Sequence, residues 1–342
     1  MTRRCPLTCE HCSTASTMAS EEHPAELFIR FVKTFTPDSH PQILAMSGGE
    51  ALLRPTLVRQ LAERAREAGT RSSVLSGLFF ASSARIPPSI LAAIRAVDHF
   101  SVSLDVFHER QVARADVFRV LDALLGEGVD LSLHIVGRSP DDPYLEDVIG
   151  DVRRTYADTI PMLVNLTAAF GRARAWLTRK LPDRPAVIDA NPCAMAAWPV
   201  VGFDGTIVAC GNDDALDQRP AHLRLGHASV DDWATIRARS LESAMLRAIR
   251  LYGPKYVAAT LGSGLGSGPG SGPGCSGYCD TCMSLPEDPV VAPRVAERMA
   301  KPSTSIVEAE AAKLIHRAGA LGFAGRQGLG GYAHLIALGS KP

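Results

Sequence analysis

The chain has 342 residues, of which 46% are hydrophobic and 21% charged, and its formal net charge at pH 7 is zero. This composition is that of an ordinary globular protein, and the length favours one large domain with a smaller module. The balanced charge gives no attraction to nucleic acid or anionic membranes, and neither a signal peptide nor an apolar membrane span is recognisable. We therefore expect a cytoplasmic protein whose eight cysteines are metal ligands rather than disulfides.

Three cysteines lie in the first twelve residues, in the run Cys5-Pro-Leu-Thr-Cys9-Glu-His-Cys12. Three thiolates on one loop cannot complete a four-ligand zinc site without a residue from elsewhere. They can hold three irons of a [4Fe–4S] cube and leave the fourth iron open. This spacing resembles the signature of the radical S-adenosylmethionine (SAM) superfamily, where an aromatic residue or His, here His11, precedes the third cysteine. The resemblance implies that Cys5, Cys9 and Cys12 hold a catalytic cluster.

The segment Ser47-Gly48-Gly49-Glu50 follows an apolar run, about 35 residues after the cysteine triad. Two glycines at the end of a buried strand let the backbone approach a ligand closely. A plain strand-to-helix turn gives the same pattern, but the place of this segment after the triad strengthens the resemblance. In the superfamily a Gly-Gly-Glu segment binds the amino group of the methionine moiety of SAM. We therefore expect Ser47, Gly48, Gly49 and Glu50 to bind the cofactor.

Short apolar runs alternate with amphipathic segments between residues 42 and 170. The expected strands are Ile43–Met46, Ser72–Leu75, Phe100–Leu104, Leu131–Val136 and Met162–Leu166, and the expected helices are Pro55–Ala68, Pro88–Ala96, Asp116–Leu125 and Tyr144–Tyr156. In the first helix, the residues of the predicted apolar face are Leu57, Val58, Leu61, Ala62 and Ala65. Alternation of this kind predicts an α/β fold with a parallel sheet and outer helices.

The resemblance makes this sheet a partial (β/α)6 barrel with SAM at the carboxyl ends of the strands. Five strands are recognisable, and only four residues precede Cys5, where the family places its first strand. We therefore expect either a start upstream of Met1 or a barrel without its first strand, which would leave an exposed sheet edge.

Polar residues end the third of these strands. Ser103 and Asp105 alternate and so face one side, and in the resembling family polar residues there bind the ribose or carboxylate of SAM. A strand end that merely reaches solvent would look the same. Farther along, His134 is expected to be a core histidine, and Gly171-Arg172-Ala173 resembles a segment found near the cofactor in many relatives.

The barrel pattern ends near residue 185. We expect a second module over residues 186–286, with a flexible Gly/Ser/Pro linker over 262–274, and a C-terminal segment of unknown role over 287–342 with one helix, Ser305–Ala318. Within the module, an Asp204-Gly205 pair between apolar runs predicts a β-hairpin that brings Cys193 and Cys210 to the same end.

A Cys275-x3-Cys279-x2-Cys282 run follows the linker. The set resembles the auxiliary-cluster module called twitch, or a shortened SPASM domain, which implies a second [4Fe–4S] cluster. Our expected ligands are Cys193, Cys210, Cys279 and Cys282, with Cys275 spare or an alternative ligand. A structural zinc site with four cysteines has the same ligand count and stays open.

The resemblance implies an oxidoreductase or maturase that accepts one electron from an external flavodoxin- or ferredoxin-type reductant, cleaves SAM to methionine and a 5′-deoxyadenosyl radical, and abstracts hydrogen from a substrate. The cofactor supplies the hard chemistry and the protein supplies its position. An auxiliary cluster favours oxidation or cross-linking of a peptide. Dehydrogenation of a small molecule such as a sugar alcohol is the alternative, and a non-catalytic metal-binding scaffold is a third. Neither nucleic acid nor membrane is an expected partner.

Overall fold

The computed structural model describes residues 1–177, 190–263, 277–326 and 328–339. The chain divides into two compact units: the first is Met1–Thr178 with Ala318–Pro342, and the second is Arg179–Arg317. Cys275 and most of the predicted linker lie outside the described residues, so the structure gives no account of that part of the prediction.

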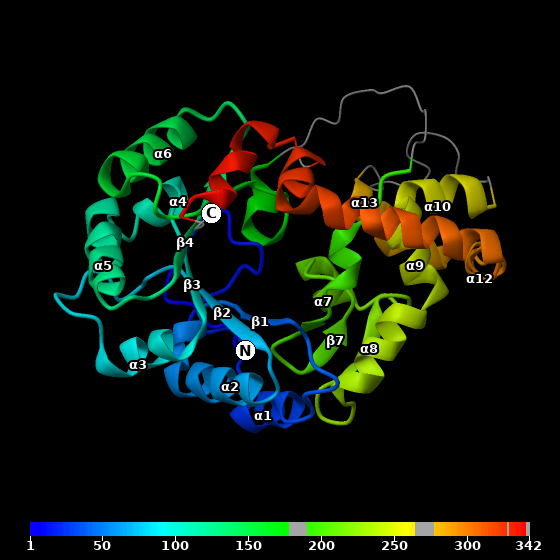
Figure 1. The fold of residues 1–342 in the computed structure, drawn as a ribbon, viewed down its shortest axis with the longest axis horizontal. Helices are drawn as coiled ribbons and strands as arrows, with labels where there is room; N and C mark the ends of the chain where they lie inside the picture. Colours follow the sequence, from blue (N-terminus) through cyan, green and yellow to red (C-terminus); the bar gives the residue numbers. More distant parts are fainter. Residues whose placement is uncertain (178–189, 264–276, 327, 340–342) are drawn as a thin grey trace. The chain divides into compact units, whose positions relative to one another are not determined.

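The first unit is an α/β half-barrel, as the alternating pattern predicts. Its parallel sheet has the order β1-β2-β3-β4-β5, with strands β1 (Ile43–Met46), β2 (Arg71–Ser76), β3 (His99–Ser103), β4 (Leu131–Gly137) and β5 (Met162–Leu166). Its helices are α1 (Ala25–Val32), α2 (Pro55–Glu67), α3 (Pro88–Ala96), α4 (Val106–Glu109), α5 (Arg114–Gly126) and α6 (Pro143–Tyr156). Figure 1 shows α2, α3, α5 and α6 along the outside of the sheet.

The two faces of the sheet differ in polarity. On the helix side of each strand the side chains are buried and mostly apolar, for example Phe100 and Val102 in β3. The opposite, concave side carries the alternate residues, for example Ser101 in β3 and Ser132 in β4, whose hydroxyl oxygens lie 2.8 Å apart. This concave side is therefore polar over the middle strands.

The two edges of the sheet differ. Among the described residues, β1 pairs only with β2, and Ile43 is 60% exposed. At the other edge, a 3-10 helix near the C-terminus, η5 (Gly330–Ala337), packs against β5. There Tyr332 donates a hydrogen bond to the carbonyl of Pro140 (2.7 Å). The C-terminal segment, whose role the sequence left open, thus covers the β5 edge.

The second unit combines a small antiparallel sheet with short helices. Its sheet has the order β6-β7-β8, with β6 (Val200–Val201), β7 (Thr206–Val208) and β8 (Arg224–His227). Its helices are α7 (Asp213–Gln218), α8 (Trp233–Glu242), α9 (Ala244–Tyr252), α10 (Pro254–Leu261), α11 (Tyr278–Ser284) and α12 (Val291–Met299). A further helix, α13 (Pro302–Arg326), begins in this unit and ends in the part of the chain that belongs to the first unit. Helical backbone in α13 is interrupted at Gly319 (φ 54°), directly after the predicted end at Ala318.

The predicted hairpin is present between β6 and β7. Val200 pairs with Val208, and the turn places Gly205 at φ 91°. Asp204 closes this turn by accepting a hydrogen bond from the N–H of Thr206 (3.0 Å).

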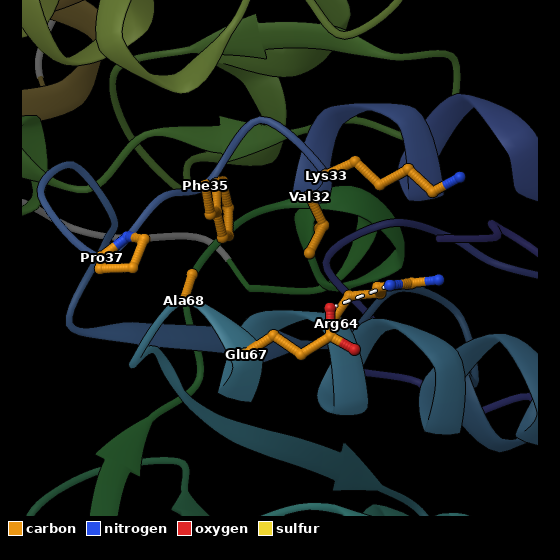
Figure 2. A pocket seen from close by; sticks show the side chains of 7 residues that line it. All are labelled: Val32, Lys33, Phe35, Pro37, Arg64, Glu67 and Ala68. Atoms are coloured by element: carbon orange, nitrogen blue, oxygen red, sulfur yellow. Dashed lines mark hydrogen bonds and ion pairs between the residues drawn. The ribbon is translucent and has the colours of Figure 1, made fainter.

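A hollow of about 150 Å³ lies on the outer side of the first unit, next to α1 and α2 (Figure 2). Surface charges line it, including Lys33 and the ion pair between Arg64 and Glu67 (2.9 Å). This hollow lacks any of the residues that the sequence marks as functional. Within the described residues, no helix combines the length and the hydrophobicity that crossing a membrane requires.

Candidate functional site

A cavity of about 310 Å³ lies at the carboxyl ends of the strands of the half-barrel. All nine residues that the sequence predicts to bind the first cluster or SAM line it: Cys5, Cys9, Cys12, Ser47, Gly48, Gly49, Glu50, Ser103 and Asp105. Such a position is where open parallel sheets bind ligands, because the loops after the strands converge there. The cavity therefore brings the cysteine triad and the Gly-Gly-Glu segment into one site.

The cysteine loop presents its thiols at the wall of the cavity. Cys5 and Cys9 are buried and Cys12 is half-buried. A turn closes the second half of the triad, since the N–H of Cys12 donates to the carbonyl of Cys9 (3.1 Å). Burial raises the pKa of the Cys5 thiol to about 12. Without a metal ion to hold it, the thiolate form of Cys5 is therefore disfavoured, as expected for a ligand shielded from water.

Arg172 holds this loop from the far end of the half-barrel. Its guanidinium donates to the carbonyls of Cys9 (2.9 Å) and Ser16 (2.7 Å), and its backbone N–H donates to the carbonyl of Cys12 (3.0 Å). The preceding Gly171 has φ 49°, and a Cβ there would lie 2.2 Å from the carbonyl oxygen of Ser13. Gly171 and Arg172, which the sequence places near the cofactor by resemblance, thus contact the backbone of the cysteine loop.

We expect Gly171→Ala to disrupt the cysteine loop. The left-handed backbone conformation costs an alanine about 1–2 kcal/mol, and the clash with the Ser13 carbonyl adds to this cost. Iron bound per chain after anaerobic reconstitution should fall. The control is Gly126→Ala at the end of α5, where a Cβ meets nothing within 4 Å. Iron content equal to wild type in Gly171→Ala would show that the loop tolerates this movement.

The Gly-Gly-Glu segment packs directly against the residues before Cys5. Gly49 and Glu50 donate their N–H groups to the carbonyls of Thr2 (2.8 Å) and Arg4 (2.9 Å). A Cβ on Gly48 would lie 2.5 Å from the Thr2 oxygen, and one on Gly49 would lie 2.3 Å from the Arg4 oxygen. The two glycines are therefore required for contact between protein segments as well as for access to a ligand.

The Glu50 carboxylate has protein partners on both oxygens. Oε1 accepts from the N–H of Leu52 (2.9 Å), and Oε2 accepts from the N–H of Gly77 (3.0 Å) and the hydroxyl of Ser76 (3.1 Å). Burial raises the pKa of Glu50, although these hydrogen bonds oppose the shift. The carboxylate thus joins the ends of β1 and β2, and the predicted contact of this segment with SAM stays a prediction.

We expect Glu50→Gln to destabilise the first unit by about 1–3 kcal/mol, because the amide NH2 would have to face a backbone N–H donor. Urea unfolding measures this change. The matched control, Glu67→Gln, removes the exposed ion pair with Arg64 and should change stability by less than about 1 kcal/mol. Equal stability of the two variants would contradict a structural role for the Glu50 carboxylate.

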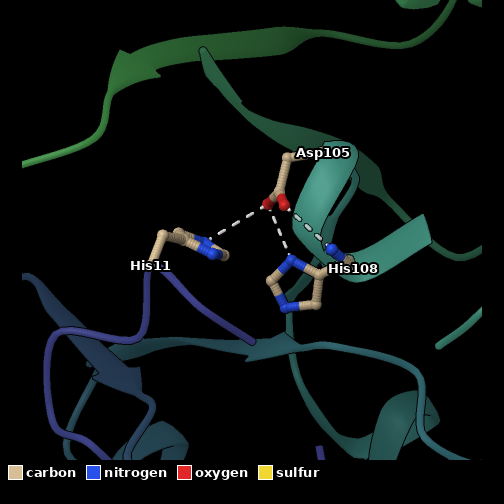
Figure 3. Close-up of side chains that lie close together, drawn as sticks. All are labelled: His11, Asp105 and His108. Atoms are coloured by element: carbon tan, nitrogen blue, oxygen red, sulfur yellow. Dashed lines mark hydrogen bonds and ion pairs between the residues drawn. The ribbon is translucent and has the colours of Figure 1, made fainter. Parts of the chain in front are cut away.

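Asp105 lies between two histidines at the cavity wall (Figure 3). Its Oδ1 caps α4 by accepting from the N–H groups of Phe107 (2.9 Å) and His108 (3.0 Å). Its Oδ2 lies 2.7 Å from Nδ1 of His108 and 3.5 Å from Nε2 of His11. The predicted cofactor contact of Asp105 therefore stays a prediction, and the observed contacts are with these histidines.

The two histidines differ in charge. Burial disfavours the imidazolium of His108, but the hydrogen bond and charge of Asp105 outweigh it and raise the pKa of His108 to about 10. Burial lowers the pKa of His11 to about 4, against the opposing charge of Asp105. His11 stacks on Phe107 with ring centroids 4.5 Å apart. At neutral pH the site thus holds a charged Asp105–His108 pair beside a neutral His11.

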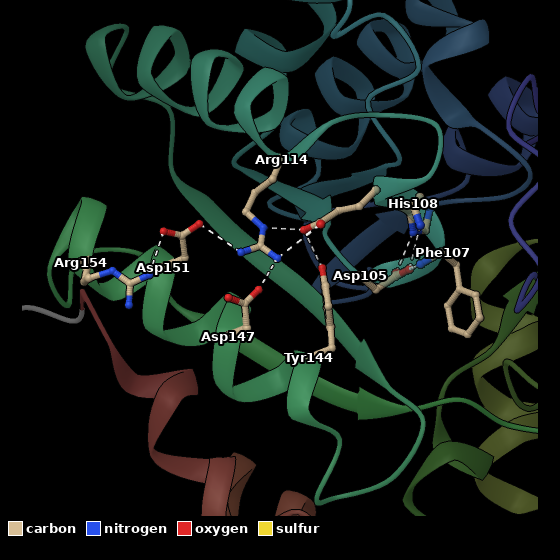
Figure 4. Close-up of polar contacts among 9 residues, drawn as sticks. Asp105, Phe107, His108, Arg114, Tyr144, Asp147, Asp151 and Arg154 are labelled. Atoms are coloured by element: carbon tan, nitrogen blue, oxygen red, sulfur yellow. Dashed lines mark hydrogen bonds and ion pairs between the residues drawn. The ribbon is translucent and has the colours of Figure 1, made fainter.

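An ionic network holds α4, which carries Phe107 and His108 (Figure 4). Arg114 of α5 pairs with Glu109 at the end of α4 (2.6 Å) and with Asp147 of α6 (2.7 Å). Tyr144 adds a hydrogen bond from its hydroxyl to Glu109 (2.8 Å). Because three helices share these contacts, the imidazole of His108 is fixed relative to the sheet.

The sequence analysis missed part of the cavity wall. His134, which it expected in the core, lines the cavity together with Asn165 of β5. Nε2 of His134 lies 2.5 Å from Nδ2 of Asn165, and burial lowers the pKa of His134. The neutral imidazole therefore accepts the amide hydrogen bond. Alternation along β4 puts His134 on the same concave face as Ser132, which is the signal that could have identified it.

Four cysteines of the second unit lie close to one another. Burial raises the pKa of Cys282, and repulsion from Cys210, Cys193 and Cys279 adds to it. Burial also raises the pKa of Cys279 to about 11, with repulsion from Cys193 and Cys210. Burial, with repulsion from Cys193, raises the pKa of Cys210. Every pair among the four therefore interacts electrostatically. His222, which the sequence did not single out, places Nε2 3.8 Å from Sγ of Cys282.

The ligand type and number of these four thiols match either a single zinc ion or a [4Fe–4S] cluster. Within the described parts of the chain, one group of His, Cys, Asp or Glu side chains places three possible metal-ligand atoms within 4.8 Å of one another, and it consists of His11, Asp105 and His108. Four sulfurs around one zinc would lie about 3.8 Å apart, given Zn–S bonds near 2.3 Å. A [4Fe–4S] cube takes one thiolate per iron and separates the sulfurs further. The choice between zinc and a cluster at the second set therefore stays a prediction.

Comparison with known proteins gives one family match. Residues 1–152 match the family model described as "Radical SAM superfamily", and the chain has no match among curated proteins. Two solved structures of anSMEcpe align with it. Polyhistidine-tagged anSMEcpe with bound AdoMet gives a TM-score of 0.48 and 13% identity over 71% of this chain and 77% of that chain. Native anSMEcpe with bound AdoMet and Cp18Cys peptide gives 0.49 and 13% over 73% and 85%. The match to the Radical SAM superfamily thus covers the part of the chain that contains the cysteine triad and the Gly-Gly-Glu segment.

Proposed function

We propose that the protein is a radical SAM enzyme that oxidises or cross-links a peptide. The observation that carries the proposal is the single cavity lined by both the cysteine triad and the Gly-Gly-Glu segment, at the carboxyl ends of five parallel strands. When bound there, a [4Fe–4S] cluster and SAM supply a 5′-deoxyadenosyl radical, at the cost of one electron from an external flavodoxin- or ferredoxin-type reductant, and this radical takes hydrogen from the substrate.

The residues of the chain position these groups. Cys5, Cys9 and Cys12 would each ligate one iron, and Arg172 holds their loop through the carbonyls of Cys9 and Ser16. The backbone of Gly48 would receive the amino group of SAM. Fixed polar groups of this kind are pre-organised, so they need no rearrangement when the cofactor binds.

The proposal of peptide oxidation rests on the second cysteine set. Hydrogen abstraction would leave a carbon radical, and loss of one further electron together with a proton to solvent would complete an oxidation. A second [4Fe–4S] cluster held by Cys193, Cys210, Cys279 and Cys282 would accept that electron. The mutual proximity of these four thiols supports this assignment.

A second candidate is dehydrogenation of a hydroxylated small molecule such as a sugar alcohol. The polar part of the cavity wall favours it, because Ser103, His134 and Asn165 line the cavity. Such neutral hydroxyl and imidazole groups can bind hydroxyl groups of a ligand.

The test is anaerobic reconstitution with iron and sulfide, followed by reaction with SAM and dithionite. We expect 5′-deoxyadenosine and methionine in equal amounts. Failure to form 5′-deoxyadenosine with a fully loaded first cluster would favour a non-catalytic scaffold. Candidate peptides and sugar alcohols are then added separately, and the rate of SAM cleavage is measured with each. Mass spectrometry of each candidate, in H2O and after exchange into D2O, detects its modification. The class that stimulates SAM cleavage is the substrate class.

A further inference from the structure

We infer that Thr14, positioned by Ser16, donates a hydrogen bond to the sulfur of Cys12 and thereby makes the first cluster easier to reduce. The inference rests on the proposed function, because it concerns a cluster bound by the cysteine triad. It assigns a role to two residues of the loop that follows the triad, outside the cysteine pattern itself.

Thr14 and Ser16 form a directed chain of hydroxyl groups. Oγ1 of Thr14 lies 3.3 Å from Sγ of Cys12 and 2.6 Å from Oγ of Ser16. A metal-bound thiolate can only accept a hydrogen bond, and the Thr14 hydroxyl has one proton to give. Thr14 must therefore donate to Cys12, and Ser16 must donate to Thr14. Hydrogen bonds in such a chain polarise and strengthen one another.

The backbone of the loop is built around this chain. Ala15, between the two hydroxyl residues, has φ 50°, a left-handed conformation that alanine rarely adopts. Arginine contacts on both sides maintain it: Arg3 donates to the carbonyl of Thr14 (3.3 Å), and Arg172 donates to the carbonyl of Ser16 (2.7 Å). Ser16 is completely buried. The strained residue thus places both hydroxyl groups in a row that ends on Cys12.

Cys9 receives a comparable donor from another element. The N–H of Thr8 donates to Oε1 of Gln111 (2.8 Å), which fixes the orientation of the amide. Nε2 of Gln111 then lies 3.6 Å from Sγ of Cys9 and donates to it. Hydrogen bonds to cluster sulfurs stabilise the more negative, reduced state and raise the reduction potential. Thr14 gives the more direct test, because valine removes its hydroxyl with little change of shape.

The experiment compares wild type with Thr14→Val and Ser16→Ala after anaerobic reconstitution, without SAM. All variants, wild type included, also carry Cys279→Ala and Cys282→Ala, so that only the first cluster is present. Iron per chain is measured first, and an EPR-monitored redox titration then gives the reduction potential of the first cluster. One lost hydrogen bond should lower the ratio of reduced to oxidised cluster at a fixed potential about fivefold. Ser16→Ala should shift the ratio in the same direction by less, because Thr14 keeps its own donor.

Thr155→Val is the matched control. Thr155 is exposed on α6, and its hydroxyl bonds only within the helix, to the carbonyl of Asp151 (2.9 Å). The reduction potential of the first cluster in Thr155→Val should equal that in wild type. ENDOR spectra of the reduced cluster should lose one exchangeable proton in Thr14→Val and keep it in Ser16→Ala and Thr155→Val.

The outcomes separate the two levels of inference. A wild-type protein that binds no iron at the triad overturns the proposed function. Normal iron content in Thr14→Val with an unchanged potential and proton signal overturns the inference about Thr14 alone. If Thr14→Val binds too little iron for titration, Ser16→Ala and Thr14→Ser decide: the inference requires a lowered potential in the first and a wild-type potential in the second.

Discussion

Joint replacement of Cys5, Cys9 and Cys12 by alanine is expected to abolish 5′-deoxyadenosine formation and to remove about four irons per chain. The three thiols line one cavity with Gly48 and Gly49, and among the described residues no other cysteine lines that cavity. The described residues therefore offer no other thiol that could replace a lost ligand in this cavity.

The alanine variant should still fold, because the hydrogen bonds of the loop run through backbone carbonyls. Arg172 would keep its contacts with the carbonyls at positions 9 and 16, and Gly49 and Glu50 would keep theirs with Thr2 and Arg4. A circular dichroism spectrum and melting temperature close to those of wild type are the control for folding. Continued cleavage of SAM by the variant in dithionite would refute the assignment of the catalytic cluster.

The spacing of hydrophobic residues predicted the strands and helices of the half-barrel well, because each of these elements follows from the pattern of residues within it. The five residues predicted for the apolar face of α2 are the five buried ones: Leu57, Val58, Leu61, Ala62 and Ala65. β1 and β5 begin and end where the pattern places them, and α3 does as well. In each of these elements one face packs on a neighbour, so the hydrophobic period and the structure agree.

Interactions between distant segments could not be predicted in this way. Glu50 binds Gly77, 27 residues away, and Arg172 binds the carbonyl of Cys9, 163 residues away. Packing of η5 against β5 joins the end of the chain to the middle. His134 is shielded from water and hydrogen-bonded to Asn165, as expected of a core histidine. Its place at a cavity could not be predicted in the same way, because it depends on the half-barrel leaving its concave face open.

The variant without Cys5, Cys9 and Cys12 is expected to retain a second set of about four irons, held by the cysteines of the second unit. Cys193 precedes β6 and Cys210 follows β7, so the hairpin brings them together. Cys279 and Cys282 lie on α11, and Tyr278 at its start donates to the carbonyl of Asn191 (2.6 Å), next to Cys193. Cys193 and Cys282 both pack against the same hydrophobic core.

This second cluster should be redox-active but unable to cleave SAM, because four thiolates leave no open iron. Iron, sulfide and zinc are measured in the reconstituted triple variant, with EPR after reduction. The control adds Cys279→Ala and Cys282→Ala, which should remove the remaining iron. One zinc per chain without sulfide would make the second unit a structural zinc site. The electron-acceptor role would then be lost, while SAM cleavage by the intact triad would remain, because its ligands and its cavity belong to the first unit alone.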